Sequence, residues 1–398
     1  MPEHALSRRR FLEVAGLGTA AALSACALSN SVQAIAQNPT LVPSPTPIPT
    51  PPFRTGKVIL GETAGTTAME QPFQPSGLPI SPDEYARLPK RILATVHYPT
   101  TARSSFPPPT RNPLNPLNMA KGPFPVLLYA HALRSFGIDA GSHPASRDFT
   151  SVDAMLRSVA SWGCVCVAPD LSWLGTLEEP RGAFNFRATV LVSYYTHLAD
   201  VLNATLFAQQ LDVSRLVLVG HSRGAKGATN AGRVISGFGN HPKSLSYGLI
   251  APEDGGQSGS DLHNLLVVGG TVDTDEGANP QIAFTAGGTP KTLVMIPGAN
   301  HYGYTDICLP DNSCGTIGLF DQNGTILRAD QQRVGAEYLA ALVRFNALGD
   351  GRALPYLNGT RMVEGLESLN LQVQAQGFVT RPTPSVVPQT THTPVVQP

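Results

Sequence analysis

One short segment, residues 215–230 (RLVLVGHSRGAKGATN), constrains the fold of this chain more than any other feature. Four apolar residues precede Gly220, and small residues follow Gly224. This order predicts a strand, a sharp turn that carries Ser222, and a helix, which is the setting that a G-x-S-x-G motif requires. The glycines have a steric task, because bulk beside a strained serine would clash with the following helix and the neighbouring strand. The segment therefore predicts Ser222 as the nucleophile of an acyl transfer.

Apolar runs rich in β-branched residues alternate along the chain with helical patterns. We expect strands at residues 91–98, 124–130, 164–168, 216–219, 247–251, 264–268 and 293–296. We expect helices at residues 150–161, 189–210 and 331–348, and one directly after Gly224. Strands of nearly continuous hydrophobicity that alternate with helices predict an α/β fold, with a mostly parallel sheet covered on both faces.

The first residues carry a targeting pattern. Residues 7–12 (SRRRFL) resemble the twin-arginine export signal of bacteria, and the apolar stretch 14–25 is too short to span a bilayer permanently. The sequence LSAC places Cys26 where a lipobox cysteine would be lipidated, which would attach the protein to a membrane. Cleavage after Ala36, in an A-x-A context, is the alternative and would release the protein. Either route predicts an exported protein, on the cell surface or secreted.

Composition divides the rest of the chain. The 36 prolines cluster largely at its ends, where alternating Pro and Ser/Thr favour extended backbone that cannot pack a core. We expect an export signal at 1–36, a Pro-rich linker at 37–55, a catalytic domain at 56–350, a C-terminal extension at 351–379, and a disordered Pro/Thr-rich tail at 380–398.

The charge of the chain limits the partners that we expect, and its cysteines limit the possible disulfides. The formal net charge is zero, and no Lys/Arg block lies outside the N-terminus, so we expect no nucleic-acid partner and a monomer. Export permits a disulfide between Cys308 and Cys314, which bracket a polar loop. Cys164 and Cys166 share one face of a buried strand and are expected to be inert core thiols.

A serine nucleophile needs a histidine base and a carboxylate that orients it. His301 follows the strand at 293–296 through a turn, and it is the candidate for general base and then general acid, titrating at about 6–7.5. Asp273 follows the preceding strand and is the first candidate for the acid, with Asp254 and Asp275 as alternatives. This chemistry requires no metal and no organic cofactor.

The oxyanion hole needs two backbone N–H groups. One belongs to Arg223, directly after the serine, and the other to Leu133 or Ala132 in the loop after the strand at 124–130. We expect His131 to fix that loop through its backbone, and His221 to pack within the turn. The residues that we expect to line the substrate cleft, all on loops near strand ends, are Leu133, Phe136, Trp173, Phe184, Phe186 and Tyr302.

Five segments together resemble the α/β-hydrolase serine esterases: PFPVLLYAHAL, SVASWGCVCVAPD, RLVLVGHSRGAKG, LLVVGGTVDTD and IPGANHYG. They are similar to the branch that contains chlorophyllases, platelet-activating-factor acetylhydrolases, dienelactone hydrolases and cutinase-like polyesterases, over residues 91–348. Three positions depart from it. Ala132 stands where the family has glycine, Ala251 stands where chlorophyllases have the acid, and His221 stands where polyesterases have an aromatic residue.

The resemblance implies a serine carboxylic-ester hydrolase that works through an acyl-enzyme on Ser222. Its substrate would be a small or polymeric ester: an acyl lipid, an aryl ester or a polyester. Two alternatives stay open, a non-catalytic binding protein displayed on a hydrolase scaffold and another serine hydrolase such as a peptidase.

Overall fold

The described part of the chain is bounded as follows. The computed structural model describes residues 50–70, 72, 82–86, 88–102, 117–132, 148–176, 184–253, 259–306, 311 and 321–378. The chain divides into two units, Met1–Thr50 and Pro51–Pro398, and the second holds the elements below. No helix in these ranges is both long enough and apolar enough to cross a membrane. The candidates outside the described residues are Cys26, Leu133, Phe136, Asp254, Cys308 and Cys314.

A nine-stranded sheet forms the centre of the second unit, in the order β1-β4-β6-β5-β7-β8-β9-β10-β11. The strands from β6 to β10 are mutually parallel, whereas β1, β4 and β11 pair antiparallel with their neighbours. Their bounds are β1 (Arg54–Leu60), β4 (Ala94–Thr100), β5 (Phe124–Ala130), β6 (Val165–Pro169), β7 (Leu211–His221), β8 (Ser244–Ile250), β9 (Leu265–Gly270), β10 (Lys291–Ile296) and β11 (Gln372–Gln376). A separate ribbon pairs β2 (Met69–Glu70) with β3 (Arg91–Ile92).

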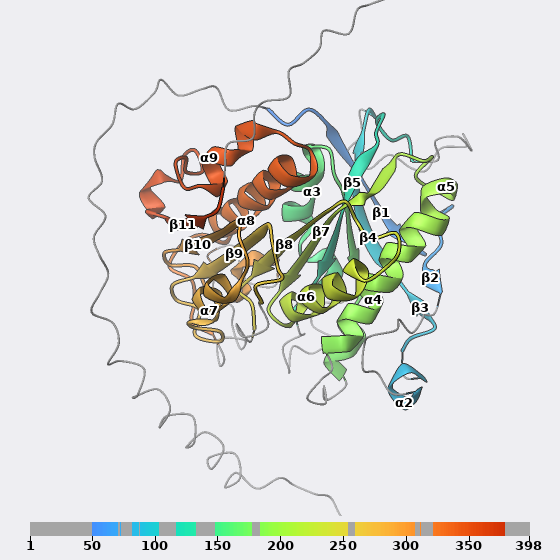
Figure 1. Cartoon of the computed structure of the whole chain (residues 1–398), viewed down its shortest axis with the longest axis horizontal. Helices are drawn as coiled ribbons and strands as arrows, with labels where there is room; N and C mark the ends of the chain where they lie inside the picture. The colour runs from blue at the N-terminus through green and yellow to red at the C-terminus, as the bar shows by residue number, and fades with distance from the viewer. Residues whose placement is uncertain are drawn as a thin grey trace, which may run out of the picture. The chain divides into compact units, whose positions relative to one another are not determined.

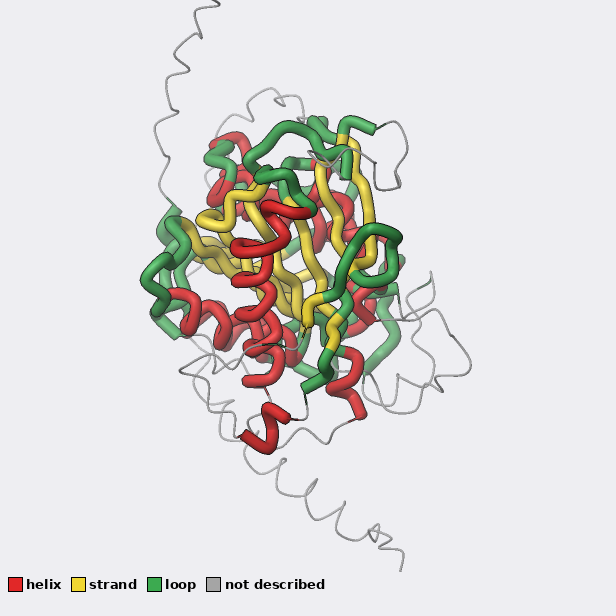
Figure 2. The backbone as a smooth tube through the Cα atoms, turned by 90° about the vertical axis from the view of Figure 1, so that its right-hand side faces the viewer, coloured by secondary structure: helices red, strands yellow, loops and turns green. Residues whose placement is uncertain are grey.

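Helices cover both faces of this sheet (Figure 1). Their bounds are α2 (Pro82–Ala86), α3 (Asp153–Ser161), α4 (Phe184–His197), α5 (Asn203–Thr205), α6 (Arg223–Ser236), α7 (Asn279–Ala286), α8 (Arg328–Leu342) and α9 (Leu354–Leu357). A π-helical segment extends α4 (Leu198–Leu202, η4), another extends α8 (Val343–Ala347, η8), and the 3-10 turns are η2 (Asp148–Thr150), η3 (Ser172–Thr176), η6 (Tyr302–Tyr304), η9 (Gly351–Ala353) and η10 (Glu367–Leu369). Figure 2 shows helices lying over the strands of the twisted sheet.

Successive side chains of the central strands point to opposite faces of the sheet and therefore pack into two separate cores. On β5, Val126 and Leu128 pack into one core with residues of α4, α6 and α7, while Leu127 and Tyr129 pack into the other with residues of α3, α8 and α9. Every residue of β5 is buried, which explains why the strand reads as a continuous apolar run rather than an alternating one. The observed architecture is the α/β-hydrolase-like fold that the sequence predicts.

The differences from the expected elements lie mainly at the edges of the sheet. The strand expected at 91–98 is divided at Leu93 into β3 and β4, and the helix expected from residue 189 already begins at Phe184. Neither β1 nor β11 was expected. β11 (QVQAQ) is half-exposed along its length, so it lacks the apolar run by which buried strands are recognised.

The parallel strands bring their carboxyl ends to one edge of the sheet. Ala130 at the end of β5 lies opposite Gly220 on β7, and Gly270 at the end of β9 lies opposite Ile296 on β10. The loops that follow these strands therefore meet at the same edge, which is where α/β sheets place their ligands.

Candidate functional site

Ser222 lies in a strained turn between β7 and α6. Its φ of 56° and ψ of −126° are unusual for a residue with a side chain. A Cβ on Gly220 would lie 2.1 Å from the carbonyl oxygen of Gly224, at the start of α6. A Cβ on Gly224 would lie 2.0 Å from the carbonyl oxygen of Ala130, on the neighbouring strand. Both glycines are thus required by close backbone approach, to the following helix and to the adjacent strand.

His301 and Asp273 form a buried hydrogen-bonded pair. Nδ1 of His301 lies 3.1 Å from Oδ2 of Asp273, and neither side chain is exposed to solvent. Because a carboxylate only accepts, Nδ1 carries the proton, and the lone pair of the neutral ring is on Nε2. The other oxygen of Asp273 accepts the backbone N–H of Glu276 at 2.9 Å, which holds the carboxylate in place.

The surroundings of His301 favour its protonated form. Burial by itself lowers the pKa of His301, but the hydrogen bond and charge of Asp273, with the charges of Asp275 and Glu276, raise it to about 9. This value lies above the range of about 6–7.5 expected from the sequence. The difference arises because three carboxylates lie around one ring, which the chain order alone does not reveal.

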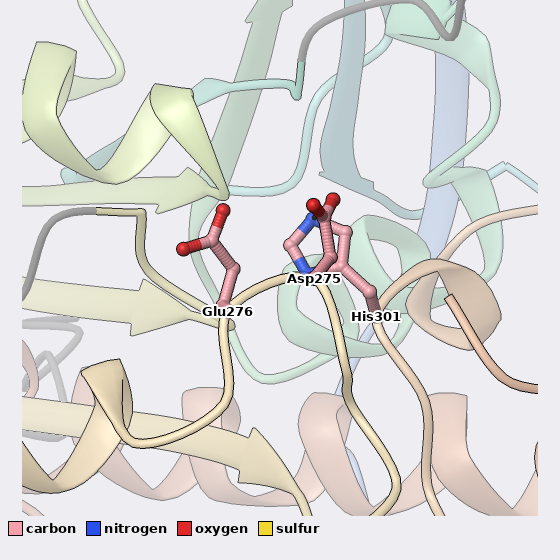
Figure 3. A group of neighbouring side chains, drawn as sticks. All are labelled: Asp275, Glu276 and His301. Carbon is pink, nitrogen blue, oxygen red and sulfur yellow. Dashed lines mark ion pairs between the residues drawn. The ribbon is translucent and has the colours of Figure 1, made fainter. Parts of the chain in front are cut away.

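One of these carboxylates, that of Asp275, lies near the free nitrogen of the ring. Oδ2 of Asp275 lies 3.7 Å from Nε2 of His301, and the hydroxyl of Tyr302 lies 3.3 Å from the same carboxylate oxygen. Asp275, Glu276 and His301 each offer a metal-ligand atom, and these atoms lie within 4.8 Å of one another. Figure 3 shows both acids rising from adjacent positions of one loop, with Asp275 next to the imidazole and Glu276 to one side. Asp275, an alternative acid in the sequence, therefore lies at Nε2 and not at Nδ1.

His221 connects the serine turn to the loop of the histidine. Its Nε2 donates to the carbonyl of His301 at 2.9 Å, and the two rings lie 4.9 Å apart. Burial, followed by the charge of His301, holds the pKa of His221 well below its ordinary value, so the ring is neutral. The sequence predicts only packing for this residue, whereas the geometry gives it a position between the two loops.

Asp321 is a site residue that the sequence does not reveal. One carboxylate oxygen accepts the backbone N–H of His301 at 2.6 Å, and the other accepts the backbone N–H of Thr274 at 3.2 Å. Asp321 is 2% exposed, and burial raises its pKa, with the charge of Asp273 acting in the same direction. The carboxylate thus joins the loop of the histidine to the loop of Asp273. No motif marks it, because it lies 20 residues after His301.

The candidate oxyanion loop follows β5, beside the serine turn. Ala132 is buried, and His131 donates from Nδ1 to the carbonyl of Ala132 at 2.9 Å. Nε2 of His131 accepts the backbone N–H of Leu171 at 2.9 Å. His131 thus fixes its loop through backbone hydrogen bonds, as expected. Arg223 is the first residue of α6, and its guanidinium pairs with Glu253 at 2.7 Å.

The aromatic cleft candidates differ in their surroundings. Tyr302 is buried, and its ring lies 4.7 Å from that of His301. Trp173 and Phe186 contact each other edge to face, at 6.2 Å between centroids, and the indole N–H of Trp173 donates to the carbonyl of Asp170. Tyr302 therefore adjoins the candidate base, while Trp173 and Phe186 pack against the core on the side of α4.

Comparison with known proteins adds a family to this geometry. A family model described as chlorophyllase matches residues 93–235, from the start of β4 to near the end of α6. Over residues 93–235 the chain is similar to the chlorophyllase family. Chlorophyllase-family hydrolases cleave carboxylic esters, and this chain is accordingly a carboxylic-ester hydrolase. A comparison with curated proteins gave no match.

The chlorophyllase match covers one half of the candidate site. It contains the loop of Ala132 and the turn of Ser222, and it ends before Asp273 and His301. The geometry of the acid and the base therefore comes from the structure of this chain and not from the family match.

Proposed function

We propose that this protein is an exported serine esterase that acts through Ser222, His301 and Asp273. The observation that carries the proposal is the buried bond between Nδ1 of His301 and Oδ2 of Asp273, 3.1 Å long. This bond leaves the lone pair of the neutral ring on Nε2. The loop of His301 is also hydrogen-bonded to His221, the residue before the strained Ser222. A carboxylate at Nδ1 and a lone pair at Nε2 are what orients a histidine as a general base, and Nε2 makes no hydrogen bond among the described residues.

Each residue has a separate step in the reaction. His301 accepts the hydroxyl proton while Ser222 Oγ attacks the ester carbonyl, and Asp273 stabilises the imidazolium that forms. The backbone N–H of Arg223, with that of Leu133 or Ala132, stabilises the oxyanion. His301 then returns the proton to the departing alcohol. Water cleaves the acyl-enzyme by the same steps, with His301 as its base.

The test is a comparison of Ser222→Ala with the unchanged protein. p-Nitrophenyl acetate, butyrate and palmitate serve as substrates, and Tm is measured in parallel. We expect kcat to fall by about four orders of magnitude or more while Tm stays close to that of the parent, because the substitution removes one hydroxyl and keeps the β-carbon in place. Retained hydrolysis by Ser222→Ala would overturn the proposal, and the trend along the acyl chains measures the length that the cleft accepts.

Export is a separate part of the proposal. The twin arginines within residues 7–12 and the cysteine of LSAC support translocation by the twin-arginine route, followed by lipidation at Cys26 or cleavage after Ala36. Replacing Arg8 and Arg9 by Lys should retain the full-length precursor in the cytoplasm. Replacing Cys26 by Ala distinguishes lipidation from cleavage after Ala36, because only a lipoprotein would lose its incorporation of radiolabelled palmitate. Export that is unaffected by Arg8→Lys/Arg9→Lys would contradict the route.

A further inference from the structure

We propose that His301, Asp275 and Glu276 form a binding site for a divalent transition-metal ion, zinc foremost, and that the bound ion blocks ester hydrolysis. The inference rests on the proposed function, because the ion would occupy the Nε2 that serves as the base. The site is therefore inhibitory and supplies no chemistry to the reaction.

The distances are close to those of a zinc site. The three ligand atoms lie within 4.8 Å of one another, and Nε2 of His301 lies 3.7 Å from Oδ2 of Asp275. Zinc binds nitrogen and carboxylate oxygen at about 2.0–2.2 Å, which places the atoms of a tetrahedral site roughly 3.3–3.5 Å apart. The pair of His301 and Asp275 is already near that separation. The remaining adjustment would turn Asp275, whose side chain is 32% exposed, away from the hydroxyl of Tyr302. It would also draw the carboxylate of Glu276 away from the amide of Asn279, which donates to it at 2.6 Å.

In its neutral form, His301 offers one ring nitrogen for ligation. Its side chain is fully buried, and Nε2 has no hydrogen-bond partner among the described residues. Buried polar atoms are nearly always paired, so Nε2 is open to an incoming partner, either the proton of Ser222 or a metal ion. Nδ1 is bonded to Asp273, and metal-binding histidines almost always donate their second nitrogen to such a carboxylate. The bond leaves the lone pair of the neutral ring on Nε2, which lies 3.7 Å from Oδ2 of Asp275.

The donor set selects the class of metal. One imidazole nitrogen and two carboxylates suit zinc and its neighbours, whereas calcium and magnesium prefer sites made only of oxygen. Asp275 and Glu276 are adjacent in the chain and both partly accessible, so the ion has a path from solvent. Figure 3 shows the two acids rising from adjacent positions of the loop beside His301.

Occupation of this site would stop the first chemical step. A lone pair that is shared with a metal cannot accept the proton of Ser222, so acylation would not begin. Removal of the ion restores the lone pair and hence the base. The inhibition is thus expected to be reversible.

Calorimetry on Ser222→Ala tests binding without any need for activity. Untagged protein is titrated with ZnCl₂, and in parallel with MgCl₂. We expect one zinc site and no magnesium binding. Adding Asp275→Asn and Glu276→Gln to this background should weaken zinc binding about tenfold or more. The matched control is Ser222→Ala with Glu253→Gln, which removes a nearby carboxylate paired with Arg223 and should bind zinc like the parent.

Hydrolysis by the chain with Ser222 intact tests the blocking step. ZnCl₂ should inhibit it, EDTA should restore it, and Asp275→Asn/Glu276→Gln should require about tenfold or more zinc for half-inhibition. Absence of zinc binding in Ser222→Ala, or equal binding by the double replacement, would overturn the metal site. Binding without inhibition would overturn the blocking step. Metal-free hydrolysis by Ser222→Ala would instead overturn the proposed function, while calorimetry still decides the metal site.

Discussion

Oδ2 of Asp275 lies 3.7 Å from Nε2 of His301, while Asp273 holds Nδ1 of the same ring at 3.1 Å. The imidazole is therefore placed between two carboxylates, one at each nitrogen. In the proposed mechanism the acid at Nδ1 orients the general base, whereas an acid at Nε2 stabilises the protonated ring at the nitrogen that must accept a proton. This second carboxylate is absent from the scheme of a simple triad, and its charge adds to the hydrogen bond and charge of Asp273 in raising the pKa of His301.

The first prediction concerns that pH dependence. Only the neutral imidazole acts as a base, and its neighbours raise the pKa of His301 to about 9. Activity should therefore be low at neutral pH, rise through the alkaline range and level off above about 9. The measurement is kcat/KM against pH in the presence of EDTA. A histidine without these carboxylates would have a pKa of about 6–7.5. An ascending limb that is already complete at about pH 7–7.5 would therefore contradict the arrangement of carboxylates.

The second prediction separates Asp275 from Asp273. Asp275→Asn removes a negative charge from the vicinity of Nε2 and keeps the size of the side chain, so the pKa of His301 should fall. The ascending limb of kcat/KM should then move to lower pH, again measured with EDTA. Glu253→Gln is the control, because Glu253 is already paired with Arg223 at 2.7 Å. An unchanged limb in Asp275→Asn would mean that Asp275 does not face the ring in solution.

The third prediction concerns Asp321, whose carboxylate joins the backbone N–H groups of His301 and Thr274. Asp321→Asn turns one acceptor into a donor that faces an N–H group, so the two loops should separate. A separation of the loops that carry His301 and Asp273 should lower kcat by about tenfold or more, with a smaller effect on KM. Asp306→Asn is the control, since Asp306 is more exposed and bonds Gln332 instead. Tm is measured for both variants. Equal kcat values for Asp321→Asn and Asp306→Asn would show that Asp321 does not position the catalytic loops.

Much of the fold and part of the site could be predicted from the sequence. The buried strands β5, β6 and β7 are continuous apolar runs, and the spacing of Gly220 and Gly224 predicts the strained Ser222. The pairing of His301 with Asp273 follows from chain order, since each is on the loop after one of two adjacent parallel strands. These features are local, or they are carried by strand order, so a single sequence contains them.

The features that could not be predicted depend on contacts between distant loops. Asp321 reaches His301 from a segment 20 residues away, and no motif marks it. The carboxylate of Asp275 is near Nε2 because of the path of one turn, which composition does not encode. β11 is a half-exposed edge strand of glutamines alternating with small apolar residues, so no apolar run signals it.

A fourth prediction tests the steric task of the turn glycines. Gly224→Ala would place a Cβ 2.0 Å from the carbonyl oxygen of Ala130, so the turn or β5 must shift. We expect a loss of about 1–3 kcal/mol in the free energy of unfolding, measured with urea, and a loss of activity. The control is Gly351→Ala, where nothing lies within 4 Å of the added carbon. Its stability should change by about 0.5 kcal/mol or less. Equal stability of the two variants would contradict the close approach.

The central claim is that Ser222 is the nucleophile, and covalent labelling tests it most directly. The unchanged protein and Ser222→Ala are treated with a fluorophosphonate, and the modified peptide is located by mass spectrometry. We predict one adduct per chain, on the peptide that contains Ser222, and none in Ser222→Ala. A protein that stays unlabelled, or one that is labelled equally with and without Ser222, would contradict the account.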